Sequence, residues 1–374
     1  MSVIQPTSNH PTHAAVAVVA AQAPLQLIQV PTVAPAAGQV RVEVHWVASS
    51  PFDLHQAEGG FFLLAPPQLL GDTATGVVVE AGEEEDSLKI GDEVFCALVP
   101  VDKQPAHQEF ITVAAHVFGK IPSNTPPQIA ATIPSSFITT WHTLTNYLSI
   151  PLPFPKPSVY TPPNADAPIL IWGAFSSVGQ YVVQILKHYG YTNIVVTASK
   201  RHHDMLRSFG ARETFDYTIL EDLERLGDFL NIHAEGVGEG RVKVLDGIGS
   251  LEGSMEPLAR MVPPGSLVAV LLPVIKKNLE GGVEYLMETQ DVVSWKGGVE
   301  TVGVRTHFYQ QDEYLRNNLQ PVIMPAMLEQ GVIKPNRARV VEGRTFLERA
   351  QNALDMLRRK EVSGERLVWR VKET

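Results

Sequence analysis

Three small residues fall at equal spacing between a strand-like run and a helix-like run. Gly173, Ser176 and Gly179 lie three residues apart, after the apolar run 169–172 and before the amphipathic run 180–189. Such a turn lets the backbone approach a pyrophosphate, and the first N–H groups of the helix point at that anion. We predict that the segment 176–179 holds a dinucleotide pyrophosphate. Small residues also begin many helices for packing reasons, which is the alternative interpretation. The predicted contacts are Ser176, Ser177, Val178 and Gly179.

The residues after the next apolar run, 194–198, indicate which dinucleotide fits. A unit that binds NAD has an acid about twenty residues past the glycine turn, where it holds the ribose 2′-hydroxyl. Here Ser199, Lys200 and Arg201 stand at that place, followed by His202, and no acid occurs before Asp204. A hydroxyl and two cations suit a 2′-phosphate, whereas a carboxylate would repel it. We therefore predict NADPH as the cofactor, against the alternative of a solvated basic turn.

Length, charge and cysteine content bound the class of protein. A chain of 374 residues, 44% hydrophobic and 19% charged, is expected to be globular and to have two domains. Its net charge of −10 argues against nucleic acid as a partner. The one cysteine, Cys96, excludes an internal disulfide and fits a reducing compartment. No apolar run reaches the roughly 20 residues that span a bilayer. We expect a cytoplasmic protein without a membrane partner.

The elements that must position these residues follow from hydrophobic periodicity and from Gly and Pro. The first 120 residues or so contain short alternating runs between glycine turns, which predict a mainly β domain. We expect a helix over 129–148 interrupted by Pro134, and a proline-rich linker over 150–168. The stretch 274–305 is predicted to be irregular. The amphipathic run 346–359 predicts a helix, and a last strand is expected to follow it.

Taken together, these stretches resemble the medium-chain dehydrogenase/reductase superfamily. Residues 71–76 and 91–94 resemble its first-domain signature, and residues 169–179 resemble the cofactor turn of its quinone-reductase-like branch. Residues 209–217 and 362–368 resemble the segments after the second strand and at the C-terminal close. The resemblance implies an α/β protein with a GroES-like β-barrel domain and a Rossmann domain built on a doubly wound parallel sheet. We place the GroES-like domain at 1–135 and 312–374, and the Rossmann domain at 136–311.

Zinc-dependent members of that superfamily carry residues that this chain lacks. A structural zinc commonly takes four cysteines and a catalytic zinc takes three protein ligands, and this chain has one cysteine. Asp72 and Thr73 stand where zinc members have His-Glu, and the turn from Ser50 to Asp53 stands where they have a cysteine. We predict that the protein holds no metal.

Within the superfamily, the chain is most similar to fungal trans-acting enoyl reductases that serve polyketide synthases. The similar features are the Ser-Pro-x-Asp turn at 50–53, the proline-rich linker, the end of the second strand and the Val-Ser-Gly-Glu close. This resemblance implies reduction of an activated C=C bond in an enoyl thioester carried on a polyketide synthase acyl-carrier domain. One alternative is an NADPH:quinone or free enone reductase that acts on a small molecule, and another is an inactive nucleotide-binding homologue. We expect a monomer, with a dimer as the alternative.

The resemblance also implies roles for residues of the first domain. Ser50, Pro51, Phe52 and Asp53 are expected to lie beside the nicotinamide. Thr139 is expected to donate a hydrogen bond to the cofactor or to the substrate carbonyl, although the adjacent Thr140 is a rival. His55 stands where related reductases often carry Lys or Tyr, and it either donates a proton or is a packed or surface histidine. The catalytic candidates are Thr139, Ser50 and His55.

The remaining candidates are implied by the resemblance in the same way. Tyr217 is expected near the adenine or its ribose, with a packed aromatic at a strand end as the alternative. His142 either contacts substrate or packs on a helix face. The expected nicotinamide contacts are Leu271, Leu272, Val362 and Ser363. The expected substrate contacts are Phe137, Ile138, Thr139, Thr140, Trp141, His142, Thr143 and Leu144.

Overall fold

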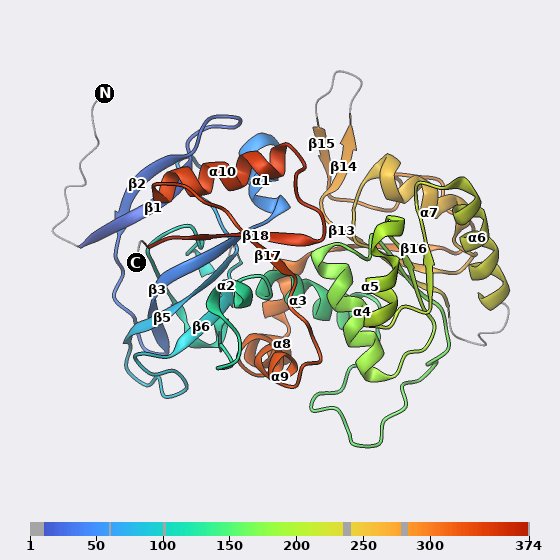
Figure 1. Cartoon of the computed structure of the whole chain (residues 1–374), viewed down its shortest axis with the longest axis horizontal. Coiled ribbons are helices and arrows are strands. Elements are labelled where there is room, and N and C mark those ends of the chain that lie inside the picture. Colours follow the sequence, from blue (N-terminus) through green and yellow to red (C-terminus); the bar gives the residue numbers. More distant parts are fainter. Residues whose placement is uncertain (1–10, 60, 100–101, 235–240, 278–282, 373–374) are drawn as a thin grey trace. The chain divides into compact units, whose positions relative to one another are not determined.

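A computed structural model of the chain describes residues 11–59, 61–99, 102–234, 241–277 and 283–372 (Figure 1). The chain divides into two compact units, each described by itself below. Unit 1 holds residues 1–132, 338–361 and 367–374, and unit 2 holds residues 133–337 and 362–366. We had assigned residues 312–337 to the first domain, and they lie in unit 2.

Unit 1 is built on antiparallel sheets around one long strand, β3. This strand pairs with β5, β7 and β18, and the larger sheet has the order β17-β18-β3-β5-β6-β8. Val40, Val42 and Val44 are at most 1% exposed, as the period-two pattern predicts. The strands are β1 (Thr12–Val18), β2 (Gln26–Pro31), β3 (Gln39–Ser49), β4 (Gln68–Leu69), β5 (Thr73–Ala81), β6 (Glu93–Ala97), β7 (Phe110–Ala114), β8 (Phe118–Lys120), β17 (Arg337–Val340) and β18 (Glu365–Arg370).

The helices of unit 1 are short apart from the last one. They are α1 (Pro51–Gly59), the 3₁₀ turn η2 (Ala115–Val117), α2 (Pro127–Ala130) and α10 (Phe346–Arg358). Thr345 caps α10 by accepting a hydrogen bond from the Glu348 N–H, and Phe346 and Leu354 lie on its buried face. The predicted amphipathic helix near the end of the chain is therefore confirmed.

Unit 2 contains a six-stranded parallel sheet with the order β11-β10-β9-β12-β13-β16. In chain order this is 3-2-1-4-5-6, the arrangement of dinucleotide-binding sheets, so the predicted doubly wound fold is confirmed. The strands of unit 2 are β9 (Ile169–Trp172), β10 (Ile194–Thr197), β11 (Glu213–Phe215), β12 (Lys243–Asp246), β13 (Leu267–Leu271), β14 (Val274–Lys277), β15 (Val283–Leu286) and β16 (Glu300–Val304).

Helices cover this sheet because its strands are apolar on both faces. Leu170 and Trp172 pack with α6 and α7 in one cluster, while Ile169 and Ile171 point to the other face, where α4 contacts β9. Figure 1 shows α4 lying beside α5. The helices of unit 2 are α3 (Pro134–His142), η3 (Thr143–Tyr147), α4 (Ser177–Tyr189), η4 (Lys200–His202), α5 (His203–Phe209), α6 (Leu220–Ala234), η5 (Leu251–Met255), α7 (Glu256–Met261), η6 (Thr306–Gln311), α8 (Glu313–Asn318), η7 (Leu319–Ile323) and α9 (Met324–Glu329).

Two stretches differ from their predicted structure. Residues 274–305 were predicted to be irregular, but they contain the hairpin β14–β15 and the sixth sheet strand, β16. Pro134 was predicted to interrupt a helix over 129–148. It instead stands at the first turn of α3, where proline needs no N–H partner, so the stretch forms α2, α3 and the π-helix η3 in succession.

Residues 312–337 belong to unit 2 because hydrogen bonds attach them to it. The hydroxyl of Tyr309 accepts from Gln320 at 2.7 Å. Gln184 on α4 accepts from the Lys334 N–H at 2.7 Å, and the Tyr181 hydroxyl accepts from the Asn336 N–H at 3.1 Å. Both Gln184 and Tyr181 are buried on the helix that follows the cofactor turn.

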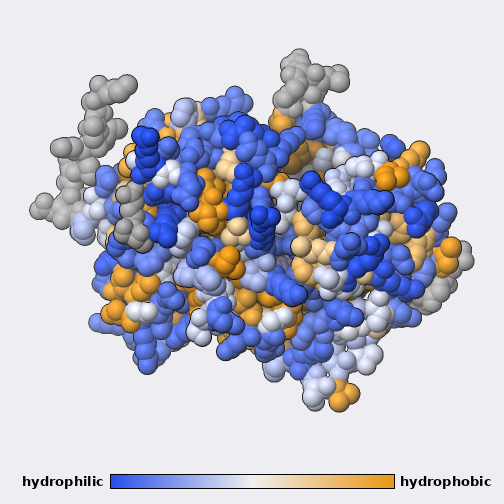
Figure 2. Space-filling view, in the orientation of Figure 1, coloured by the Kyte–Doolittle hydropathy of each residue, from blue (hydrophilic) through white to orange (hydrophobic). Residues whose placement is uncertain are grey.

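The surface drawn in Figure 2 is mainly hydrophilic, with hydrophobic residues in small separate groups. This is typical of globular proteins that expose some apolar side chains singly. No helix among the described residues is both long enough and apolar enough to span a membrane.

The close approach of α4 to the turn after β9 predicts an unusual response to mutation. A Cβ at Gly179 would lie 2.6 Å from the Ala174 Cα and 2.7 Å from the Ala174 carbonyl oxygen. Gly179→Ala should therefore destabilise the protein by about 1–3 kcal/mol, although alanine normally favours a helix interior. Thermal unfolding followed by circular dichroism measures the change. Gly297→Ala is the control, because a Cβ there meets nothing within 4 Å. Equal melting temperatures for the two variants would contradict the packing argument.

Candidate active site

The predicted pyrophosphate turn is formed by Gly173 to Gly179. Gly173 has a φ of +75°, and its N–H donates to the Thr197 hydroxyl at 3.0 Å, which holds the end of β9 against β10. Ser176, where a middle glycine was looked for, accepts from the Gly179 N–H at 3.1 Å and is the N-cap of α4. The N–H groups of Ser177 and Val178 lie in the first turn of α4, where a helix offers no carbonyl partner. These N–H groups fit an anion.

The turn lies at the point where strand order reverses, between β9 and β12. Dinucleotides bind at such a point, outside the carboxyl ends of the strands. Gly247 follows β12 and donates its N–H to the Trp172 carbonyl at 2.9 Å, and a Cβ there would lie 3.4 Å from the Ser176 hydroxyl. The sequence interpretation missed Gly247. The pattern Gly247-Ile248-Gly249 after an apolar run was the signal that could have found it.

Asp246 shapes this second turn. Its carboxylate accepts from the Ser254 hydroxyl at 2.6 Å and from the N–H groups of Ile248 and Gly249 at 3.0 and 3.1 Å. Asp246 is fully buried, and burial raises its pKa to about 6, although these hydrogen bonds oppose the shift. Asp246 therefore positions the backbone of the turn.

The predicted 2′-phosphate residues gather at the end of β10. The Lys200 N–H donates to the Asp216 carboxylate at 2.8 Å, which turns the chain so that the Lys200 and Arg201 side chains are exposed. The hydroxyls of Ser199 and Tyr217 lie 3.4 Å apart. Tyr217 is 42% exposed, so the alternative of a packed aromatic does not describe it. The structure brings these residues together, and their contact with a cofactor stays a prediction.

Ser363 lies with this cluster. Arg201 donates to the Ser363 hydroxyl at 3.1 Å, whereas we had expected Val362 and Ser363 along the nicotinamide together with Leu271 and Leu272. The two leucines follow one another at the carboxyl end of β13 and are half-buried. The contact with Arg201 places Ser363 near the expected 2′-phosphate, a link that sequence spacing could not show.

Thr139 reaches the carboxyl edge of the sheet from α3. Its hydroxyl donates to the Ser135 carbonyl at 2.8 Å and lies 3.1 Å from the hydroxyl of Thr306, which follows β16. Thr139 is half-buried, so its hydroxyl remains a candidate for substrate. Thr306 was not among the predicted site residues. Its position was missed because β16 lay in the stretch predicted to be irregular.

The other seven predicted substrate residues are buried. Phe137 stacks on Trp141, and these two rings pack against Tyr181 and Tyr189 of α4. Thr140 donates to the Val178 carbonyl at 3.1 Å, which ties α3 to the first turn of α4. Burial lowers the pKa of His142 to about 4. The buried residues are Phe137, Ile138, Thr140, Trp141, His142, Thr143 and Leu144.

In unit 1, the predicted turn at Ser50 is held by two carboxylates. Asp53 accepts from the Ser50 N–H at 2.7 Å and from the Gly71 N–H at 3.0 Å, and it is 2% exposed. The first bond is one half of a capping box at the start of α1. The Ser50 hydroxyl lies 3.4 Å from Asp72, which accepts from Thr73. Asp53 thus positions Ser50, while Pro51 is exposed and Phe52 half-buried.

His55 lies on the same helix, α1. Burial lowers its pKa to about 4, so the imidazole is neutral near pH 7. A neutral imidazole can still donate its one N–H, but it is a weaker acid than imidazolium.

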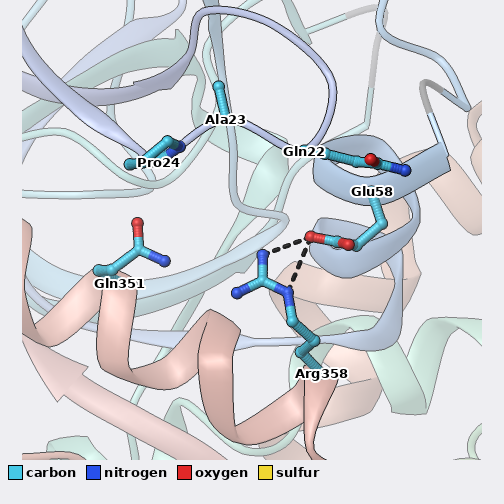
Figure 3. A pocket seen from close by; sticks show the side chains of 6 residues that line it. All are labelled: Gln22, Ala23, Pro24, Glu58, Gln351 and Arg358. Carbon is cyan, nitrogen blue, oxygen red and sulfur yellow. Dashed lines mark hydrogen bonds and ion pairs between the residues drawn. The ribbon is translucent and has the colours of Figure 1, made fainter.

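A hollow in unit 1 lies outside all the predicted contacts. Figure 3 shows Arg358 of α10 reaching Glu58 of α1, with the guanidinium Nε donating at 3.0 Å. This ion pair ties α10 to the helix that begins after Ser50. Gln351 also accepts from the Leu25 N–H at 2.9 Å. The lining residues are Gln22, Ala23, Pro24, Glu58, Gln351 and Arg358.

In the part of the chain that the structure describes, there is no group of three or more His, Cys, Asp or Glu side chains that could hold a metal ion. Cys96 is buried, and burial raises the pKa of its thiol. The absence of a metal from the functional protein stays a prediction.

Comparisons with known proteins agree with this architecture. Residues 36–123 match the family described as alcohol dehydrogenase GroES-like domain. A trans-enoyl reductase of Aspergillus terreus is 30% identical over 217 residues, which are 55% of this chain and 68% of that protein. A trans-enoyl reductase of Aspergillus japonicus is 28% identical over 255 residues, 66% and 72% of the two chains. The enoyl reductase component of the Aspergillus terreus lovastatin nonaketide synthase is 32% identical over 187 residues, 48% and 49%.

Solved structures show the same fold. The crystal structure of CurK enoyl reductase matches 96% of this chain and 99% of its own, with a TM-score of 0.71 and 20% identity. A quinone oxidoreductase of Pseudomonas syringae matches the same shares with a TM-score of 0.70 and 19% identity. The predicted combination of a GroES-like and a Rossmann domain is confirmed.

A buried histidine beneath the Gly71 turn predicts sensitivity to acid. His107 is 2% exposed, its ring would meet a Cβ at Gly71 at 2.3 Å, and neither ring nitrogen has a hydrogen-bond partner among the described residues. Burial lowers its pKa to about 4. In the unfolded chain the His107 imidazole has its ordinary pKa near 6.5, so below that pH it binds a proton. In the folded protein it stays neutral until the pH falls to about 4. Stability should therefore fall by about 3 kcal/mol from this residue as pH falls from about 6.5 to about 4.

Urea unfolding of the wild type and of His107→Phe at pH 7 and pH 4.5 measures this effect. The variant should lose less stability between the two pH values, whatever its stability at pH 7. An equal loss in both proteins would show that His107 is not the acid-sensitive group.

Proposed function

The chain belongs to the medium-chain dehydrogenase/reductase superfamily of oxidoreductases, and from this premise we propose that it is an NADPH-dependent enoyl reductase. Its substrate would be an enoyl thioester on the acyl-carrier domain of a polyketide synthase, which it would reduce in trans as a separate chain. We further propose that it acts as a monomer in the cytoplasm. Three fungal relatives that are named as enoyl reductases support the reaction type.

We propose NADPH as the cofactor because of the cation cluster at the end of β10, which consists of Lys200 and Arg201. Lys200 and Arg201 are exposed beside the Ser199 hydroxyl, at the place where an NAD-binding sheet has a carboxylate. Arginine and lysine are the side chains that recognise phosphate. The capped first turn of α4, with N–H groups at the strand-order reversal, supports a pyrophosphate at the same edge.

Thr139 is the residue that we propose to act on the substrate carbonyl. NADPH, when bound, supplies a hydride. As hydride adds to the β-carbon, negative charge develops on the thioester oxygen, and the α-carbon then takes a proton. A hydroxyl hydrogen bond to that oxygen stabilises the charge. For Thr139 to donate it, its hydroxyl must leave the Ser135 carbonyl, and the Thr306 hydroxyl at 3.1 Å can donate to Thr139 in turn.

The alternative substrates differ in how the acceptor is presented. A quinone or a free enone accepts hydride from the same cofactor. The quinone oxidoreductase of Pseudomonas syringae is 19% identical to this chain, and that likeness shows the fold alone. Two relatives that match with higher identity, 30% and 32%, are named for enoyl reduction. We therefore keep the enoyl thioester as the proposed substrate, and the experiment below separates it from a quinone and from an inactive homologue.

Purified protein should oxidise NADPH when offered an α,β-unsaturated thioester, which is measured by the absorbance of the reduced nicotinamide. Lys200→Ala combined with Arg201→Ala should raise the NADPH KM about 100-fold, because two charge-assisted contacts are lost, and should leave the NADH KM little changed. Turnover with a quinone alone would refute the thioester assignment. Failure to bind NADPH would refute the enzyme assignment.

Thr139→Val should lower kcat by about 100-fold, the lower end of the range for removing a hydrogen bond to a developing oxyanion. The NADPH Kd should change little. Thr145→Val is the matched control, because Thr145 also donates to the carbonyl four residues before it, at 2.8 Å, on the following π-helix. The outcome against the proposal is an equal kcat for the two variants.

A further inference from the structure

Arg201 is held by two hydrogen-bond acceptors. Its Nε donates to His202 Nε2 at 3.0 Å, and its Nη2 donates to the Ser363 hydroxyl at 3.1 Å. A guanidinium has five N–H groups, so both Nη1 protons and the second Nη2 proton remain for a ligand. Two fixed points define the plane and direction of the guanidinium, whereas an unheld arginine on the surface samples many rotamers.

His202 is itself fixed by an aromatic stack. Its ring lies on the ring of Phe175, with centroids 3.5 Å apart and planes 10° apart. Because Arg201 donates to His202 Nε2, the imidazole must be neutral there. Burial, together with the nearby Arg201 and His203, lowers the pKa of His202, which favours this neutral state. Phe175 belongs to the cofactor turn, so the stack links that turn to the cation cluster.

The second acceptor comes from a distant part of the sequence. Residues 362–366 lie in unit 2, although the residues on both sides of them lie in unit 1. Gly364 allows their approach, because a Cβ there would lie 1.8 Å from Phe175 Cε1. Buried Gln180 donates to the carbonyl of Phe175 at 3.0 Å and to that of Gly364 at 3.4 Å. Gln180 therefore fixes the segment against the turn.

We propose that Phe175, His202 and Ser363 form a clamp that orients Arg201 for the 2′-phosphate and so sets the preference for NADPH over NADH. This inference rests on the proposed function, and it adds three positioning residues to the phosphate contacts. The clamp holds the arginine before the ligand arrives, so binding does not have to order that side chain. NADH has no phosphate at this place, and its affinity does not depend on where Arg201 points.

The test measures NADPH and NADH dissociation constants by titration calorimetry. Ser363→Ala should weaken NADPH about three- to tenfold, as expected for the loss of one orienting interaction, and should leave NADH unchanged. Phe175→Ala alters the turn that both cofactors would contact, so it should weaken NADPH about three- to tenfold more than it weakens NADH. Ser363→Thr keeps the hydroxyl and should keep NADPH affinity. In an Arg201→Ala background, Ser363→Ala should have no further effect, because the serine acts only through the arginine.

Ser208→Ala is the matched control, since the Ser208 hydroxyl donates to the Met205 carbonyl on α5, outside the clamp. The clamp alone would be overturned if the wild type prefers NADPH and the NADPH affinity of the Ser363→Ala and Phe175→Ala variants is unchanged. Equal losses for NADPH and NADH would also overturn it, because they would indicate a general packing role. A wild type without preference for NADPH would overturn both the clamp and the proposed cofactor.

Discussion

The approach of α4 to the turn after β9 is the constraint on which unit 2 depends. Gly179 has no Cβ, so the first turn of the helix can lie against the Ala174 backbone. The Ser176 cap fixes where the helix begins, and Thr140 attaches α3 to the same first turn. Further along α4, Tyr181 and Gln184 hold residues 334–336. The cofactor turn, the Thr139 helix and the helices after β16 are therefore all placed relative to one helix.

Three buried carboxylates of this protein shape turns. Asp53 holds the Ser50 turn in unit 1, Asp246 holds the turn after β12, and Asp216 accepts from the Lys200 N–H and from Thr218. Each is at most 6% exposed, and each buried charge is compensated by N–H or O–H donors. A chain with a net charge of −10 can thus contain a cationic edge. The buried acid at that edge, Asp216, accepts from the Lys200 N–H and from the Thr218 hydroxyl.

Local pattern was sufficient to predict the parts of the fold that have a short-range cause. The spacing of Gly173, Ser176 and Gly179 predicted the turn, and hydrophobic periodicity predicted β9, α4 and α10. Contacts over long sequence distances were out of reach. The strand β16 lies in a glycine-rich stretch with little hydrophobic periodicity. Its position is set by pairing with β13 in the parallel sheet, which the sequence pattern does not reveal. Likewise, the bond from Arg201 to Ser363 joins residues 162 positions apart, and the burial of Phe137 and Trp141 depends on two tyrosines of α4.

At the proposed 2′-phosphate site, a preference for NADPH over NADH would depend on the arrangement of the charged residues as much as on their number. Asp204, the first acid after β10, lies only three residues from Arg201, yet it binds Arg207 at 3.2 Å. Asp216, the next acid close to the cluster, is occupied by the Lys200 N–H and by Thr218. Arg201 instead meets two neutral acceptors, His202 and Ser363. A neutral acceptor orients a guanidinium without cancelling its charge, whereas a carboxylate would do both and weaken its attraction for phosphate. The positive charges of Lys200 and Arg201 therefore remain available at the end of β10, because the neighbouring carboxylates bind other groups.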